Sequence, residues 1–236
     1  MMVKHIFTNH KQFALLYFSI LLIDIFVKIQ FPVFPYRYIS KPWLLIFLLG
    51  YFYLNKIGND KRKHRYMLLA LSFFFIGDML IINHLSIVFL GLSLLFFSIG
   101  KIFLCMKFSH KKDFNVSRLI PFTIIMFGYV IFLIGFLYKN LKDFLVPALA
   151  SFFLTLLMFQ FAYLRKEVFN KKSYLYVLFG IILFVISEGI MAIKTFKREI
   201  PYQDFLIMFF YGTSVYFMVL GVVNEKEYEY FEIEEA

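Results

Sequence analysis

Eight apolar stretches dominate the sequence, and each is near the roughly 20 residues that a helix needs to cross the hydrocarbon of a bilayer. Hydrophobic residues make up 61% of the chain. Helices satisfy their own backbone hydrogen bonds in lipid. We therefore predict an all-α, polytopic membrane helix bundle of about eight transmembrane helices, forming one domain over residues 1–224 with an acidic tail over 225–236. The stretches are 12–29, 42–57, 66–82, 85–108, 118–138, 144–164, 173–193 and 205–223.

The basic residues favour one orientation of this bundle. The terminal segments and the loops on their side carry about twice as many Lys and Arg residues as the loops on the other side, and cytoplasmic loops are the ones enriched in these residues. We predict that both termini and the acidic tail are cytoplasmic, in a multi-pass protein of the cell membrane. A bacterial inner membrane is the expected location. The net charge of +10 then reflects topology, and no nucleic-acid partner is expected.

Several common kinds of site have no motif in this sequence. The single cysteine, Cys105, lies in an apolar stretch, so a disulfide framework is excluded. The five histidines show no metal-ligand spacing, and neither a phosphate-binding loop nor a nucleophile elbow is present. We expect no metal, no cofactor and no hydrolysis by a serine triad.

Three acidic residues stand inside apolar stretches, namely Asp24, Asp78 and Glu188, and the last two are the candidate catalytic residues. Asp78 lies near the end of 66–82 and Glu188 lies within 173–193. A charged group at the centre of a bilayer costs about 2.5–3.5 kcal/mol on insertion scales, so such acids usually face a bundle interior or cavity. Under the predicted orientation both lie in the outer halves of their helices, where we expect a shared polar pocket. The alternative for Asp78 is an acid at the helix end that extends to the membrane interface. The alternative for Glu188 is a helix face that only packs against another helix and tolerates an acid.

Paired carboxyl groups in an apolar pocket can divide acid and base roles. One can hold a proton and donate it, while the other, ionised, stabilises a cation or activates water. Glycosidases cleave acetals in this way, and an enol ether could be treated similarly. Gly180, Ser187 and Glu188 share one broad helix face, where small residues would let a neighbouring helix approach closely.

Other charged residues near these stretches have more than one reading. Lys41, beside Pro42 at the start of 42–57, can bind a lipid phosphate, pair with the acids or anchor the interface. Lys101 lies inside 85–108 and either extends to the interface or pairs with an internal acid. Asp24 precedes Lys28 by four residues, and we expect these two to pair.

The motifs, taken in order, resemble the YhhN family of lysoplasmalogenase-like membrane proteins. The resemblance covers roughly residues 40–221. The elements that carry it are Lys41-Pro42, Gly77-Asp78, Phe89, Gly91 and Phe96, the group Gly180, Leu183, Phe184, Ser187, Glu188 and Ala192, and finally Tyr211.

This resemblance implies an ether hydrolase that cleaves the vinyl ether bond of a lysoplasmalogen-type lysophospholipid, releasing an aldehyde and a glycerophospho-alcohol. Its partner would be a lysophospholipid or another membrane lipid. The family's acidic pair would map to Asp78 and Glu188, with Lys41, Ser187 and Tyr211 binding substrate. The alternative is a non-catalytic lipid-binding or proton-coupled transport protein that uses the same carboxyl groups. The oligomeric state is left open.

Three departures mark the chain as a divergent member. The family usually has aspartate where this chain has Glu188, one methylene longer. A histidine is expected near Gly100 or Lys101, and a glutamine near Val215, and neither is present.

Overall fold

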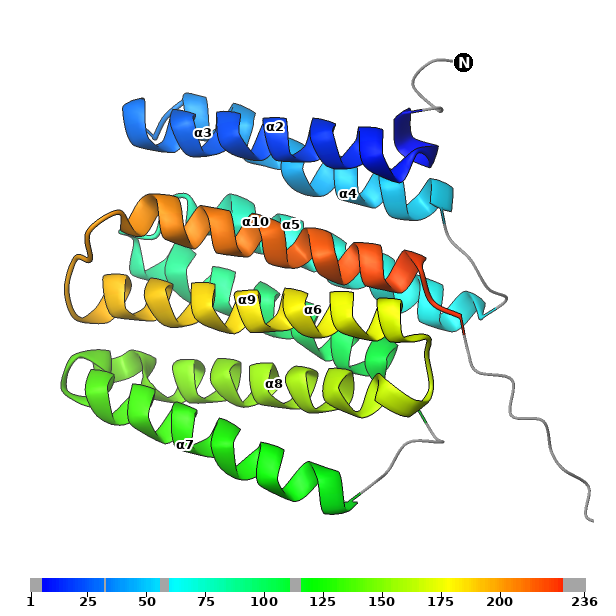
Figure 1. Ribbon diagram of the computed structural model, residues 1–236. Helices are drawn as coiled ribbons and strands as arrows, with labels where there is room; N and C mark the ends of the chain where they lie inside the picture. Colours follow the sequence, from blue (N-terminus) through cyan, green and yellow to red (C-terminus); the bar gives the residue numbers. More distant parts are fainter. Residues whose placement is uncertain (1–5, 32, 56–59, 111–115, 227–236) are drawn as a thin grey trace, which may run out of the picture.

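The computed structural model describes residues 6–31, 33–55, 60–110 and 116–226, with the backbone alone for Val116, Arg118 and Glu167. Over these ranges the chain folds into long α-helices with short connections (Figure 1), and each predicted apolar stretch corresponds to one helix. The all-α prediction is therefore confirmed. The elements are α2 (His10–Gln30), α3 (Tyr36–Ser40), α4 (Pro42–Asn55), α5 (Lys61–Ile81), α6 (Ile87–Phe108), α7 (Val116–Leu141), η1 (Lys142–Phe144), α8 (Leu145–Leu164), η2 (Arg165–Glu167), α9 (Lys171–Phe196) and α10 (Gln203–Val223).

Helix starts follow the local sequence. The side chain of Asn9 caps α2 by accepting from the backbone N–H groups of Lys11 and Gln12, and Asp60 caps α5 in the same way. Pro42 has no N–H and therefore cannot continue the hydrogen-bond ladder of α3. The helix is interrupted at Lys41, and a new helix, α4, begins at Pro42.

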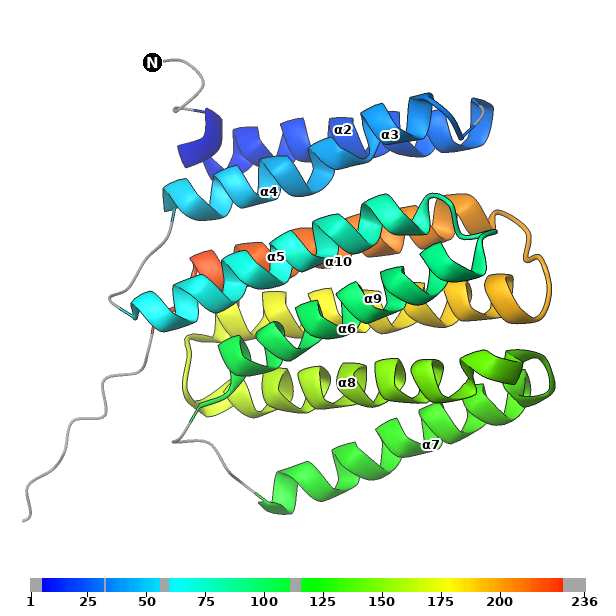
Figure 2. The same ribbon diagram turned by 180° about the vertical axis from the view of Figure 1, so that it is seen from behind.

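The long helices run roughly parallel or antiparallel to one another (Figures 1 and 2). α2 and α4 form one side of the bundle and α7 lies on the far side. α9 packs most extensively on α10, and α5 on α6, while α8 contacts α6, α7 and α9. The start of α2 and the end of α10 lie at the same end of the bundle, as the predicted even number of crossings requires.

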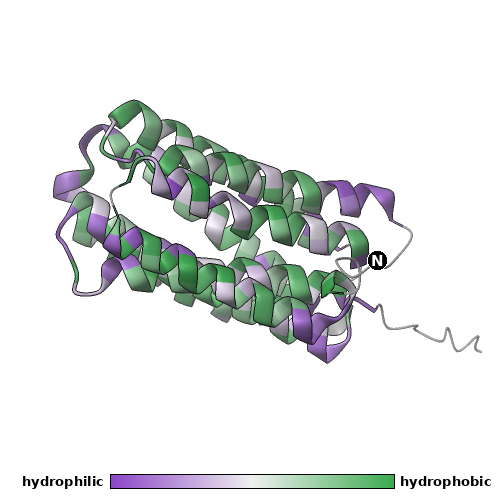
Figure 3. Ribbon diagram, turned by 90° about the horizontal axis from the view of Figure 1, so that it is seen from above, coloured by the Kyte–Doolittle hydropathy of each residue, from purple (hydrophilic) through white to green (hydrophobic). Residues whose placement is uncertain are grey.

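Hydropathy varies along the helix axes. Hydrophilic residues gather at the two ends of the bundle and hydrophobic residues cover its middle (Figure 3), which is the pattern of a bilayer-spanning protein. Six stretches of the described residues are long and apolar enough to cross a membrane, and one of them, Leu119–Leu164, includes both α7 and α8. α4, with 14 residues, is shorter than a full crossing on its own. The chain is thus a multi-pass membrane protein.

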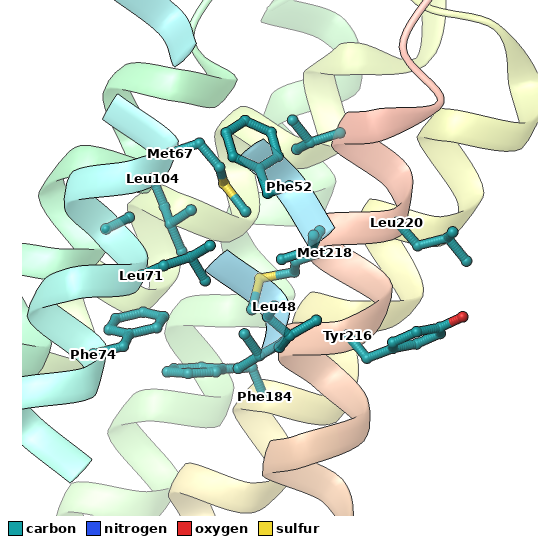
Figure 4. Close-up of a cluster of buried hydrophobic side chains, with 14 of the residues drawn as sticks. Leu48, Phe52, Met67, Leu71, Phe74, Leu104, Phe184, Tyr216, Met218 and Leu220 are labelled. Atoms are coloured by element: carbon teal, nitrogen blue, oxygen red, sulfur yellow. The ribbon is translucent and has the colours of Figure 1, made fainter. Parts of the chain in front are cut away.

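The core lies between α2, α4, α5, α6, α8, α9 and α10. Phe52 of α4, Phe74 of α5 and Phe184 of α9 are among its buried side chains (Figure 4). Phe74 and Phe184 stack with their ring centroids 5.7 Å apart. This stacking packs α5 against α9, the two helices that carry the polar site described below.

Small residues allow α9 and α10 to approach closely, as the sequence predicted. A Cβ atom on Gly180 would lie 2.7 Å from the carbonyl oxygen of Ser214 and 2.8 Å from the amide nitrogen of Met218. A Cβ atom on Gly221 would likewise meet the backbone of α9, at Val177 and Ser173. Backbone atoms cannot move aside as a flexible side chain can, so larger residues at either glycine would separate the two helices.

An ion-pair cluster ties the end of α10 to the neighbouring loops. Glu225 accepts from Lys107 at 2.7 Å and from Arg165 at 2.8 Å, and the guanidinium of Arg165 also stacks on Phe169. The first acidic residue of the predicted tail is therefore packed against the bundle. Residues 227–236 of that tail lie outside the described residues.

Candidate functional site

A cavity of about 270 Å³ lies toward the end of the bundle opposite the start of α2, where the loop containing His84 joins α5 to α6. Residues of α2, α3, α5, α6, α8, α9 and α10 line it. Much of its wall is apolar, including Phe97, Phe152, Phe184 and Met208. An apolar cavity with a few polar groups is the usual form of a small-molecule site.

Asp78 reaches this cavity from the last turn of α5. Its carboxylate pairs with the ammonium of Lys41 at 2.9 Å and accepts a hydrogen bond from the phenol of Tyr211, also at 2.9 Å. Asp78 is 2% exposed. The helix break at Pro42 places Lys41 beside it. Of the roles considered for Lys41, the structure shows pairing with an acid, and Tyr211 binds that same acid.

Glu188 enters the same cavity from α9. Lys101 of α6 pairs with its Oε1 atom, Ser151 donates to that atom at 3.0 Å, and Thr155 donates to Oε2 at 2.6 Å. Lys101 also donates to the hydroxyl of Ser151 at 2.7 Å. Of its two possible roles, Lys101 therefore has that of pairing with an internal acid, and it is 1% exposed.

The two carboxylates line one cavity, as the sequence analysis expected. They do so through separate hydrogen-bond groups, each with its own lysine. Asp78 accepts from Lys41 and Tyr211, while Glu188 accepts from Lys101, Ser151 and Thr155. The expected division of acid and base roles between them stays a prediction.

Ser187, the remaining predicted site residue, also lines the cavity. Its buried hydroxyl donates to the carbonyl of Ile207 at 2.9 Å, which links α9 to α10 next to Glu188. In this position Ser187 holds the helix that carries the carboxylate.

The expected Asp24–Lys28 pair is wrong. Asp24 instead accepts from Arg37 at 2.6 Å and from Ser40 at 2.6 Å, because α3 folds back against the end of α2. Lys28 pairs with Asp204, in the first turn of α10, at 3.0 Å. The four-residue spacing on α2 predicted the wrong pair because both side chains bind partners on other elements.

Sequence reasoning missed Ser151 and Thr155. They lie four residues apart on α8, so they share one face of an otherwise apolar helix. That polar pair was the signal that α8 faces the site. Within the part of the chain that the structure describes, no three His, Cys, Asp or Glu side chains are grouped as a metal site would require.

Comparison with known proteins identifies the family. The YhhN family model matches residues 36–222, which span α3 to α10 and contain Lys41, Asp78, Glu188 and Tyr211. Searches of curated proteins and of solved structures gave no match. With most of its length covered by the family model, the chain belongs to the YhhN family.

Proposed function

We propose that this protein hydrolyses the vinyl ether bond of a lysoplasmalogen-type lipid within the membrane. The observation that carries the proposal is the convergence of Asp78 and Glu188 on one largely apolar cavity, in a chain of a family that includes lysoplasmalogenases. A lipid with one long chain suits such a cavity, because its tail is apolar and its reactive bond lies close to its polar head.

The first step is protonation of carbon. An enol ether is cleaved once a proton adds to its β-carbon, which leaves an oxocarbenium ion at the carbon attached to oxygen. In our proposal the Asp78–Lys41 pair supplies this proton: it passes from the ammonium to the carboxylate and then to the substrate carbon. The carboxylate left behind and Glu188 both face the cation and lower its energy.

The second step is attack by water. The side chain of Glu188 is 19% exposed, against 3% for Asp78, so we assign the orientation of water to Glu188. The proton that the water loses returns through the carboxylates to Lys41, which restores the starting state. The resulting hemiacetal then breaks into a fatty aldehyde and a glycerophospho-alcohol, with no net gain or loss of protons by the protein.

The remaining site residues position the two carboxylates. Tyr211 fixes one oxygen of Asp78, while Ser151 and Thr155 hold both oxygens of Glu188. Lys101 takes the position near which the family's histidine was expected, and its charge balances Glu188. The longer glutamate reaches this lysine and both hydroxyl groups at once, which gives the aspartate-to-glutamate departure a structural role.

The proposal is tested by incubating the purified protein, in a maltoside detergent, with a lysoplasmalogen in D2O and analysing the products by mass spectrometry. We expect fatty aldehyde with one deuterium at carbon 2, because that carbon receives the catalytic proton. Free aldehyde of the same length, incubated alongside, corrects for exchange. The matching alkyl-ether lipid has no double bond to protonate and must remain intact.

Absence of aldehyde over a protein-free control would contradict hydrolysis. Proton-dependent uptake of lipid into liposomes without product would instead favour transport by the same carboxyl groups. Aldehyde formed without deuterium at carbon 2 would contradict the carbon-protonation step.

A further inference from the structure

The mouth of the cavity carries a cluster in which positive charge exceeds negative charge. Lys28 and Lys194 both contact one oxygen of Asp204, at 3.0 and 2.6 Å. Lys28 is in the last turn of α2 and Lys194 in the last turn of α9, while Asp204 is in the first turn of α10. Two ammonium groups therefore share one carboxylate, which leaves one positive charge unmatched.

The deeper cations of the cavity do not share this excess. Arg37 is paired with Asp24, Lys41 with Asp78 and Lys101 with Glu188. Each of these cations has a carboxylate of its own. An anionic ligand entering the cavity would thus find its unmatched positive charge at Lys28 and Lys194.

Exposure places this cluster at the entrance. The side chain of Asp204 is 38% exposed and those of Lys28 and Lys194 are 19% and 17% exposed, whereas the side chain of Asp78, deeper inside, is 3% exposed. All three mouth residues line the cavity. A polar head group can therefore contact them while its chain lies against the apolar walls.

The spacing suits a glycerophospholipid. Lys194 follows Glu188 by six residues, which is about 9 Å along the helix axis at 1.5 Å per residue. In a lysoplasmalogen only the three-carbon glycerol unit separates the vinyl ether oxygen from the phosphate ester. A lipid with its phosphate on the mouth lysines would place its ether bond at the depth of the carboxylates.

We propose that Lys28 and Lys194 form a phosphate subsite for a one-chain glycerophospholipid. When the lipid binds, contacts to its phosphate replace part of the contact that these lysines make with Asp204. The role of this subsite in turnover rests on the proposed function, but binding itself does not. Ammonium–phosphate contacts are charge-assisted and stronger than those between neutral groups. The assignment also moves the phosphate away from Lys41, whose charge Asp78 already balances.

Binding is tested without catalysis by using an alkyl-ether lysophosphocholine, which lacks the reactive double bond. Its affinity for the full-length protein in a maltoside detergent is compared with that of the alkylglycerol of the same chain length. We expect the phosphate lipid to bind more tightly. Lys28→Gln and Lys194→Gln are each expected to weaken its binding about tenfold or more, and to leave alkylglycerol binding unchanged.

Asp204→Asn supplies a prediction of opposite sign. It frees both lysines, so the phosphate lipid should bind severalfold more tightly, whereas a loss of structure at the mouth would weaken binding. Lys139→Gln is the matched control: this exposed lysine at the end of α7 is not among the cavity-lining residues, and its removal should change nothing.

Equal affinity for the phosphate lipid in all variants, or weaker binding in Asp204→Asn, would overturn the subsite. Free glycerol phosphate binding with the same variant pattern, and without any advantage for the lipid, would assign the lysines to a soluble phosphate ester instead. If the protein releases aldehyde but all variants bind the phosphate lipid equally, the subsite is wrong and the proposed hydrolase stands. If the variants bind as expected but no aldehyde is released, the subsite stands and the proposed hydrolase is wrong.

Discussion

Replacing Lys101 with methionine should destabilise the protein, because the Glu188 carboxylate is left without its ammonium partner. Methionine has a similar length and fills the same space, so the main loss is the ammonium that pairs with Glu188 and donates to Ser151. Removing one partner of a buried ion pair costs about 3–5 kcal/mol. Because Glu188 keeps two hydroxyl donors and is 19% exposed, we expect a cost near the lower end, about 3 kcal/mol.

Thermal unfolding in one detergent, at one scan rate, measures this loss. For a chain of this size about 2–4 °C of melting temperature corresponds to 1 kcal/mol, so Lys101→Met should melt about 6–12 °C lower. Glu188→Gln leaves the ammonium of Lys101 buried without a carboxylate and should cost a similar amount. Lys139→Met, an exposed substitution of the same kind, should leave the melting temperature nearly unchanged.

The double variant Lys101→Met/Glu188→Gln decides whether the pair acts as a unit. It removes both charges, so its loss should be close to that of one single variant, with a coupling of about 2 kcal/mol or more. If the two losses instead add, Lys101 and Glu188 do not stabilise each other in the folded protein, and the description of the Glu188 site is wrong.

Three further predictions concern packing, the end cluster and the site. Gly180→Ala should cost about 1–3 kcal/mol of stability by forcing α9 from α10, while Gly128→Ala, with open space around its Cβ position, should be neutral or stabilising in the same melting assay. Burial alone would raise the pKa of Glu225, but Arg165 and Lys107 hold this pKa below its usual 4.5. The folded protein therefore binds this proton less readily than the unfolded chain, and its stability should fall as the pH drops below about 4.5. Glu225→Gln should flatten that part of the melting-temperature profile, and an unchanged profile would refute the assignment. Tyr211→Phe should reduce turnover about 10- to 100-fold, because it removes one hydrogen bond to the Asp78 carboxylate, and full activity would exclude Tyr211 from the site.

Much of the fold was predictable because hydrocarbon restricts what a chain can do. A long apolar stretch in a bilayer must form a helix, so hydropathy predicted the helices. The small size of Gly180 likewise predicted close packing of another helix against α9. Asp78 and Glu188 were predictable as cavity residues for the same reason, since an acid in lipid needs a polar surrounding.

The partners of these acids were not predictable from the sequence. Which lysine pairs with which carboxylate depends on how helices distant in the chain are placed side by side. Asp24 shows the difficulty: its neighbour four residues on was the local choice, and the fold of α3 gave it Arg37 instead. Ser151 and Thr155 likewise gained meaning only once α8 was known to face Glu188.

In the proposed mechanism two carboxylates act together on a lipid in one cavity. The most direct test of this joint action is to compare the rates at which three proteins release aldehyde from a lysoplasmalogen. These are the wild-type protein, Asp78→Asn and Glu188→Gln, each shown to be folded by its melting curve. We expect release by the wild type and a loss of about 100-fold or more in both variants, the range in which a positioned acid or base contributes. Equal rates in all three folded proteins would contradict the catalytic role of the two carboxylates.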